Sequence, residues 1–311
     1  MTFTIRIKEE ITKISINNIE ARSELAGFIS LAGVVKNNKL ILTMENAAVA
    51  RRVYKNLKEI FGINIRVIVR NQKRFRIKQI YILEISDKFD YVLESLGIYA
   101  DNKKRLPEEY SVDSLEEKAN FLAGVFLSIG SISDPATSGY HLEFVTNTKK
   151  ESNYLKKMLN EFNIESKIIK RQKKYMTYIK IAEMISDFLR LINATNALFY
   201  FEDIRIYRDH KNMVNRLNNC ELANQEKVIN TGLKHLEEID YLEEHNLIDL
   251  LDDKIKVIIN YRKKYPESSY QELADIISME TEYKIGKSGV NHHFIKMKEL
   301  VKKHKEKILE Q

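Results

Sequence analysis

The residues best suited to chemistry lie near the C-terminus, on the polar face of a helix that the sequence predicts from Ser288 onward. Asparagine can form two hydrogen bonds with an adenine edge, and lysine can bind guanine or neutralise a phosphate. Serine and the free backbone amides of a helix start can hold a phosphate. These residue types favour DNA contact over bond-breaking chemistry. The candidate DNA-binding residues are Lys287, Ser288, Asn291, His292, His293 and Lys296.

Two other motifs in this segment fail on spacing. The tripeptide GKS at 286–288 resembles the end of a phosphate-binding loop, but that loop needs a glycine five places earlier, where Thr281 stands. His292 and His293 are adjacent, so their side chains diverge by about 100° on a helix and cannot share a metal ion. Neither motif is a site, and for the chain as a whole we predict no catalytic residue, no metal site and no cofactor.

Three helices must position the candidate residues. The first, 254–264, ends before a proline, which disfavours helical geometry in the residue ahead of it. Ser269 with Glu272 is a capping signature for the second helix, and after a loop at 278–286 Ser288 caps the third. That order is typical of a helix-turn-helix, although the loop is longer than usual. Polar residues on a solvated helix are also common without any function, and only capping, spacing and charge together favour DNA binding.

Charge divides the chain into modules of opposite sign. The 311 residues carry a formal net charge of +7. Residues 1–220 hold 36 basic and 26 acidic side chains, 221–253 hold 2 and 10, and 254–311 hold 13 and 8. An acidic helical connector thus separates two basic modules, and it either serves solubility or competes with DNA for a basic face. The amide-rich stretch 215–220 at its start could cap a helix or contact the neighbouring domain. The expected parts are a first domain 1–212, with halves of about 1–105 and 106–212, an acidic helical linker 213–253 and a helix-turn-helix domain 254–311.

The first module is duplicated. The residues LAGFISLAG at 25–33 return as LAGVFLSIG at 122–130, 97 positions later. Residues 17–20 and 114–117 are N-cap signatures that open both helices. Glycine inside a helix costs about 1 kcal/mol relative to alanine, so we expect the two helices to touch backbone to backbone. The glycines concerned are Gly27, Gly33, Gly124 and Gly130.

Each copy continues as strands, a second helix and more strands. The second helices are predicted at about 47–61 and 148–162, and an additional turn at 134–139 belongs in a surface loop. Alternation with period two from 65 to 83 predicts strands with an apolar side toward the core and cations on an open sheet face. The apolar set is Ile65, Val67, Val69, Ile77 and Tyr81, and the secondary basic surface is Arg66, Arg70, Arg74, Arg76 and Lys78, with Lys170, Arg171 and Lys173 in the second copy.

These features resemble the LAGLIDADG homing endonuclease fold over about residues 1–210. The resemblance implies two motif helices packed along a pseudo-twofold axis and two saddle-shaped sheets that straddle the DNA major groove. It also implies a metal-binding acid at the eighth motif position of each copy, where this chain has Ala32 and Ile129. The sixth positions, Ser30 and Leu127, offer no carboxylate either. Because a hard divalent cation requires oxygen ligands, nuclease chemistry is predicted to be lost while the fold remains.

The order of a degenerate duplicated LAGLIDADG domain, the segment NRLNNCELAN and a C-terminal KSGVNHHFIKMKEL looks like the WhiA family of bacterial regulators. The resemblance extends over nearly the whole chain, and 215–224 and 287–291 are its most specific parts. It implies an α+β duplicated domain followed by an all-α helix-turn-helix domain, without nuclease activity. It further implies sequence-specific binding of double-stranded promoter DNA and transcriptional control of sporulation, cell division or chromosome segregation. The family commonly has arginine where this chain has His293.

The composition limits where in the cell the protein is expected and which classes of partner it is expected to bind. The single Cys220 excludes an internal disulfide and a cysteine zinc cluster. No apolar run reaches the roughly 18 residues that a membrane span requires. We therefore expect a cytoplasmic, nucleoid-associated protein with no membrane or small-molecule partner. Whether transcription machinery or another regulator also binds it stays open.

Two competing hypotheses follow from the same residues. A divalent-metal endonuclease with relocated ligands would use Asp134 or Glu143, although Asp134 beside a proline is more typical of a turn. An RNA-binding intron splicing cofactor would retain structured RNA better than duplex DNA.

Overall fold

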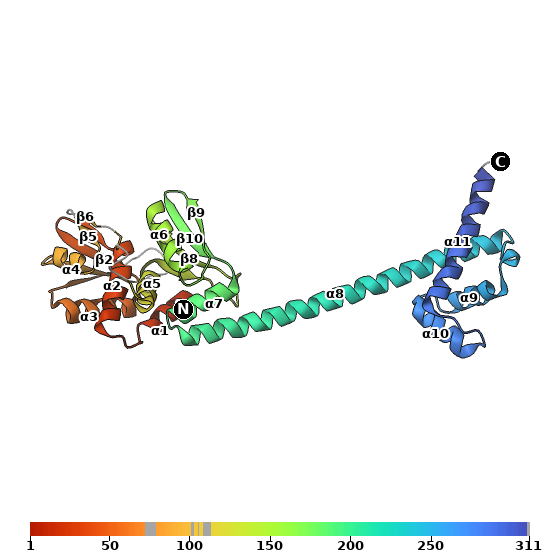
Figure 1. The fold of residues 1–311 in the computed structure, drawn as a ribbon, viewed down its shortest axis with the longest axis horizontal. Coiled ribbons are helices and arrows are strands. Elements are labelled where there is room, and N and C mark those ends of the chain that lie inside the picture. The colour runs from red at the N-terminus through yellow and green to blue at the C-terminus, as the bar shows by residue number, and fades with distance from the viewer. Residues whose placement is uncertain (72–78, 101–102, 105, 108–112, 310–311) are drawn as a thin grey trace. The chain divides into compact units, whose positions relative to one another are not determined.

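The computed structural model describes residues 1–71, 79–100, 103–104, 106–107 and 113–309. Contacts divide the chain into two units, Met1–Asp209 and His210–Gln311 (Figure 1), and each has its own apolar core. Four residues of the predicted strand pattern lie outside the described part of the chain. They are Arg74, Arg76, Ile77 and Lys78.

The two halves of the first unit repeat one order of elements. The first half contains α1 (Phe3–Ile11), α2 (Asn18–Ala32), β1 (Val34–Lys36), β2 (Lys39–Met44), α3 (Ala47–Phe61), β3 (Arg66–Asn71), β4 (Gln79–Ile85) and α4 (Phe89–Ser95), followed by β5 (Tyr99–Ala100) and β6 (Lys103–Lys104). The second half contains α5 (Leu115–Ile129), β7 (Gly130–Ile132), β8 (Leu142–Thr146), α6 (Lys149–Asn160), β9 (Lys167–Arg171), β10 (Lys174–Ile179), α7 (Ala182–Leu191) and the start of α8 (Thr195–Glu244). The antiparallel sheets have the matching orders β1-β2-β4-β3 and β7-β8-β10-β9, which confirms the predicted duplication.

The motif helices α2 and α5 touch backbone to backbone. Both open on the predicted capping boxes. A β-carbon added at Gly27 would overlap the carbonyl oxygen of Phe121, and one added at Gly124 would overlap the carbonyl oxygen of Glu24. The expected close approach is therefore confirmed for the first glycine pair. Each of these glycines lies against the main chain of the other helix.

The second glycine pair has a different role from the predicted one. Gly33 and Gly130 follow the last helical residue as C-caps in extended conformation, with φ of −69° and −76°. A β-carbon on either would meet its own half of the unit, at Ile29 and at Phe126. The prediction of contact between helices is wrong here because both helices end one residue earlier.

The predicted alternation holds in the described strands β3 and β4, but the apolar side of β3 is not buried. Val67 pairs with the buried Leu83 and Val69 with Tyr81, on the core side of the sheet. Both valines are nevertheless half exposed. β3 is an edge strand, and only one of its sides is paired, with β4. The prediction that Val67 and Val69 enter the core is therefore wrong.

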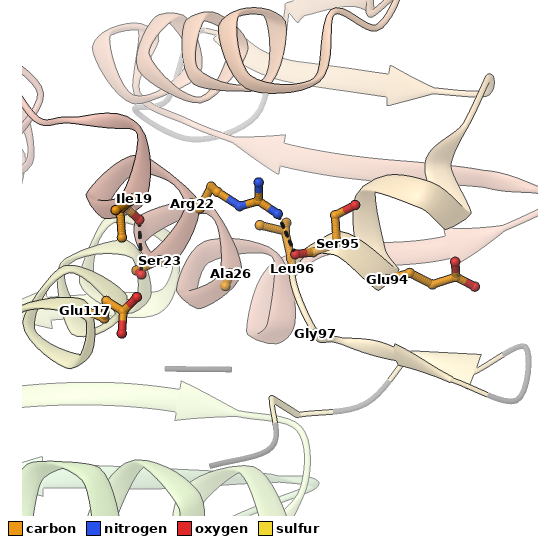
Figure 2. A pocket seen from close by; sticks show the side chains of 9 residues that line it. All are labelled: Ile19, Arg22, Ser23, Ala26, Glu94, Ser95, Leu96, Gly97 and Glu117. Carbon is orange, nitrogen blue, oxygen red and sulfur yellow. Dashed lines mark hydrogen bonds between the residues drawn. The ribbon is translucent and has the colours of Figure 1, made fainter. Parts of the chain in front are cut away.

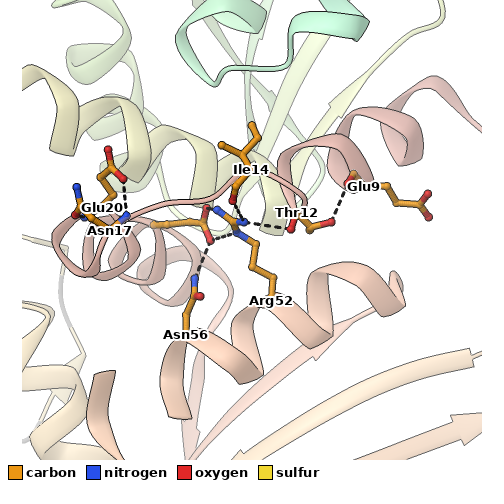
Figure 3. Close-up of polar contacts among 8 residues, drawn as sticks. Glu9, Thr12, Ile14, Asn17, Glu20, Arg52 and Asn56 are labelled. Atoms are coloured by element: carbon orange, nitrogen blue, oxygen red, sulfur yellow. Dashed lines mark hydrogen bonds and ion pairs between the residues drawn. The ribbon is translucent and has the colours of Figure 1, made fainter. Parts of the chain in front are cut away.

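A buried polar network joins α2 to α3 (Figure 3). The guanidinium of Arg52 donates to both carboxylate oxygens of Glu24, with Nε at 2.7 Å and Nη2 at 2.8 Å. The same carboxylate accepts from Asn56 Nδ2 at 3.2 Å. Arg52 Nη1 donates to the carbonyl oxygens of Ile14 at 2.7 Å and Thr12 at 3.2 Å. The network thereby fastens the loop after α1 and both helices together.

The N-terminal helix α1 forms hydrogen bonds with two parts of the second half, the strand β7 and the start of α8. Thr4 Oγ1 donates to the carbonyl oxygen of Ile132 and accepts from its backbone N–H, at 2.8 and 2.9 Å, on the edge strand β7. The Glu10 carboxylate accepts from the backbone N–H groups of Asn196 and Ala197, at 2.6 and 3.1 Å. Glu10 thus caps the start of α8, where unpaired amides favour a negative charge.

The second unit consists of helices. It contains the rest of α8, a short 3-10 helix η2 (Ile248–Leu250), α9 (Asp253–Lys264), α10 (Tyr270–Glu280) and α11 (Lys287–Leu309). The three predicted helices after residue 253 and the capping box at Ser269 are confirmed. The loop after α10 is shorter than predicted, 281–286, because α10 continues to Glu280.

The acidic segment is not a separate element. The amide-rich stretch 215–220 lies exposed in the interior of α8, so it does not cap a helix. Further along the same helix, Ile239 and Leu242 are buried in the core of the second unit. The domain boundaries proposed from charge stay a prediction.

Two polar side chains are buried where α8 meets the three-helix core. The ring of His235 stacks on Phe294, with centroids 3.8 Å apart, and its Nε2 lies 3.2 Å from Tyr270 Oη. Arg262 is 1% exposed, and its Nη1 donates to three carbonyl oxygens of the loop after α9, the shortest bond being to Ser268 at 2.6 Å. The histidine thus joins α8 to α10 and α11, and the arginine stabilises the loop between α9 and α10.

Burial of His235 predicts an acid-sensitive second unit. Burial, with the charges of Arg262 and Lys298, lowers the pKa of His235 from 6.5 to about 4. A histidine with a lowered folded-state pKa contributes stability that is complete above pH 6.5 and is lost as pH falls toward about 4. We expect a loss of about 3 kcal/mol over that window. Hydrogen exchange of α10 and α11 amides, at about pH 7 and about pH 4.5, measures it.

The matched variants are His235→Phe, which keeps a stacked ring without an ionisable group, and His210→Gln on an exposed part of α8. We expect His235→Phe to be less sensitive to acid than the unmodified protein, and His210→Gln to be equally sensitive. An unchanged pH dependence in His235→Phe would contradict the assignment.

Candidate nucleic-acid interface

The first turn of α11 is set by the loop that precedes it. The backbone N–H of Val290 donates to the carbonyl oxygen of Gly286 at 3.0 Å, so the chain is already helical at Lys287. Ser288 therefore lies inside the first turn and does not cap the helix as predicted. The loop itself is held by Ser278, whose Oγ bonds both backbone groups of Ile285 at 3.1 Å.

Four candidate residues share the solvent side of α11. Ser288, Asn291, His292 and Lys296 are all exposed. Residues three and four apart lie on one face of a helix, so the first three are neighbours. The opposite side of α11 is buried through Val290, Phe294, Met297 and Val301. Lys287 is also exposed, at the helix start.

His293 lies beside the core and not with the other candidates. Its Nε2 is 3.2 Å from Tyr283 Oη in the loop before α11, and its Nδ1 is buried without a hydrogen-bond partner among the described residues. Burial, followed by the charges of Lys296 and His292, lowers the pKa of His293. The ring, hydrogen-bonded to Tyr283, stabilises the loop before α11. Contact between His293 and a DNA base stays a prediction.

The described cations of the secondary basic surface are all exposed, but they do not share one face. Arg66 and Arg70 lie on the open face of the first sheet, and Arg66 is 3.9 Å from the carboxylate of Glu84. In the second sheet Lys170 and Arg171 are successive strand residues, so they point to opposite faces. Lys173 lies in the turn between β9 and β10.

The ends of the motif helices carry no metal-binding chemistry. Ser30 is buried and donates to the carbonyl oxygen of Gly27 at 3.2 Å, and Leu127 is buried as well. Ala32 and Ile129 are partly buried apolar residues. Within the described ranges, no three His, Cys, Asp or Glu side chains are grouped so that they could hold a metal ion.

The two acids that the endonuclease hypothesis would use as metal ligands contact other groups of the protein. Asp134 Oδ1 accepts from the backbone N–H of Ala136 at 2.9 Å and from Tyr200 Oη at 3.1 Å, as expected for a turn residue. Glu143 lies 3.1 Å from His141 Nε2 on the second sheet.

A pocket of about 490 Å³ opens in the first unit between α2, α4 and the start of α5 (Figure 2). Arg22 Nη2 donates to the carbonyl oxygen of Ser95 across it, at 2.9 Å. Glu94 and Glu117 are the other charged residues that line it. The pocket contains none of the predicted site residues.

Known proteins match this chain over almost its whole length. Residues 18–99 match the family model of the WhiA N-terminal LAGLIDADG-like domain, 118–211 that of the WhiA LAGLIDADG-like domain, and 214–301 that of the WhiA C-terminal HTH domain. A probable cell division protein WhiA from Bacillus velezensis is 37% identical over 307 residues, covering 96% of both chains. The Bacillus subtilis protein of the same name is 36% identical over the same length.

Solved structures agree with the fold. A full-length DUF199/WhiA from Thermatoga maritima is similar, with a TM-score of 0.58 at 23% identity over 97% of this chain and 99% of that one. The N-terminal LAGLIDADG domain of a DUF199/WhiA protein has a TM-score of 0.50 at 28% identity, over 61% of this chain and 90% of its own. None of the described helices is long and apolar enough to cross a membrane.

Proposed function

This chain belongs to the WhiA family, and from that premise we propose that it is a non-enzymatic protein that binds double-stranded promoter DNA sequence-specifically. In this proposal it regulates transcription in cell division, chromosome segregation or sporulation, at the nucleoid. The observation that carries it is the exposed face of Ser288, Asn291 and His292 at the start of the last helix of a helix-turn-helix. In that motif, this part of the helix enters the major groove.

Charge supports the same reading. The C-terminal 58 residues hold 13 basic and 8 acidic side chains, and Lys287 and Lys296 flank the exposed face of α11. Cations beside a recognition helix bind phosphates, and this fixes the register of the helix without reading sequence. The exposed cations of the first unit are proposed to add attraction to the DNA backbone. Transcription machinery or another regulator is a further proposed partner.

Binding measured at one fixed salt concentration tests the proposal, because affinity from phosphate contacts falls steeply with salt. We expect the full-length protein to bind some promoter fragments more tightly than random duplexes of equal length. Equal binding to all duplexes would overturn it. Magnesium-dependent cutting would instead favour an endonuclease, and stronger retention of structured RNA would favour a splicing cofactor.

Asn291→Ala is expected to lower specific binding by about 1 to 3 kcal/mol with little change in nonspecific binding. The reason is that asparagine reads a base edge, whereas lysine contacts phosphate. The control Lys303→Ala, an exposed change further along α11, should weaken specific and nonspecific binding alike and reduce the salt dependence. Fluorescence anisotropy with both kinds of duplex measures the difference. Equal losses on the two duplexes for Asn291→Ala would exclude base readout by this residue.

A further inference from the structure

An exposed apolar side chain interrupts the polar face in the first half of α11. Ile295 is 46% exposed, whereas Val290, Phe294, Met297 and Val301 of the same helix are buried. It therefore belongs to the solvent side and not to the core. Ile295 follows Asn291 by four residues and Ser288 by seven, so these three side chains form one line along the helix.

The chemistry of the major groove offers a partner for such a side chain. Base pairs present hydrogen-bond donors and acceptors there, and thymine alone adds a methyl group. This inference rests on the proposed function. We propose that Ile295 contributes to the sequence specificity of DNA binding by contacting the methyl group of a thymine near the base pair that Asn291 reads. An isoleucine cannot form hydrogen bonds, so apolar contact is the discrimination available to it.

The spacing of the line fixes where that thymine lies. One helical turn rises about 5.4 Å, and successive base pairs lie about 3.4 Å apart. The thymine is therefore one or two base pairs from the adenine bound by Asn291. Lys298 and Glu299, three and four residues beyond Ile295, are both exposed and charged. Ile295 is therefore followed on this face by charged side chains and not by further apolar ones.

A single isoleucine between polar neighbours is too small for a protein-docking patch. Surfaces that bind proteins expose contiguous apolar areas of several hundred Å². Ser288, Asn291 and His292 are polar, and Lys296 and Glu299 are charged. The face is suited to a groove lined with polar edges and one methyl group.

Deoxyuridine lacks only the methyl group of thymidine, so it tests the contact directly. The tightest duplex selected from a random library by the full-length protein is resynthesised with each thymine replaced in turn. We expect one of these replacements to weaken binding about fourfold, which is the factor that corresponds to burying one methyl group. The sensitive thymine should lie one or two base pairs from the adenine that Asn291 binds. In Ile295→Ala that replacement should have no effect, while the unmodified duplex binds more weakly.

Ile308→Ala is the matched control, since Ile308 is exposed to a similar degree near the end of the same helix. This variant should keep the full sensitivity to deoxyuridine. Ile295 is on the surface, so its replacement leaves the fold intact, and circular dichroism checks this. A selected duplex in which no thymine matters, or equal sensitivity in Ile295→Ala, would overturn the thymine contact alone. Failure to select any duplex over random DNA would overturn the proposed function and the contact with it.

Discussion

Replacing Gly124 by alanine is expected to destabilise the first unit by about 3 kcal/mol or more, the upper end of what overpacking costs. The added β-carbon would overlap the carbonyl oxygen of Glu24 in the facing helix. Flexible side chains can move aside, but the main chain of α2 is fixed by its own helical hydrogen bonds. The two motif helices would have to separate, and the core that surrounds them would open. Hydrogen exchange of the α2 and α5 amides measures the loss.

Gly139→Ala is the control for this prediction. Gly139 lies in the loop between β7 and β8, where an added β-carbon meets nothing within 4 Å. A surface change of this kind stays within about 0.5 kcal/mol. Gly27→Ala should resemble Gly124→Ala, because Gly27 meets the carbonyl oxygen of Phe121 in the same way. If Gly124→Ala were as stable as Gly139→Ala, the backbone contact between the helices would be disproved.

Arg52→Met is expected to cost the first unit about 3 to 5 kcal/mol, the range for breaking a buried ion pair on one side. Glu24 is 2% exposed and Arg52 is 9% exposed, so the variant leaves a carboxylate in the core with only Asn56 beside it. Arg51→Met, an exposed change at the adjacent position, is the control and should be nearly neutral. Replacing both partners, as Glu24→Leu with Arg52→Met, should recover much of the loss.

The same pair predicts a dependence on pH. Burial raises the pKa of Glu24 above its ordinary 4.5, and the hydrogen bonds and charge of Arg52 oppose that rise. Without Arg52 the rise is larger. A carboxyl group with a raised folded-state pKa stabilises the fold below its unfolded value and loses that contribution as pH rises through the folded value. The difference in unfolding free energy between Arg52→Met and the unmodified protein should therefore become smaller toward pH 4.5 and larger toward neutral pH. A deficit independent of pH would show that Glu24 does not carry it.

The sequence by itself determined the elements and much of their grouping. Capping boxes at 17–20, 114–117 and 269–272 need residues only three positions apart, so local pattern identifies them. The repeated motif predicted the duplication, and the backbone contact at Gly27 and Gly124 followed from the cost of glycine in a helix. That Ala32 and Ile129 cannot bind a hard metal ion follows from their side-chain chemistry alone.

Only the tertiary structure decided which of these residues are covered. Gly33 is a cap and not a contact, and Val67 stays half exposed because β3 is an edge strand. Arg52 meets a carboxylate 28 positions away, and His293 turns toward Tyr283 in the preceding loop. Whether a side chain is buried, and which group it bonds, depends on segments that folding brings together. A periodic sequence pattern shows only which face of its own helix or strand a residue occupies. Ile295 lies off the periodic apolar face of its helix, and the core of the second unit leaves it 46% exposed.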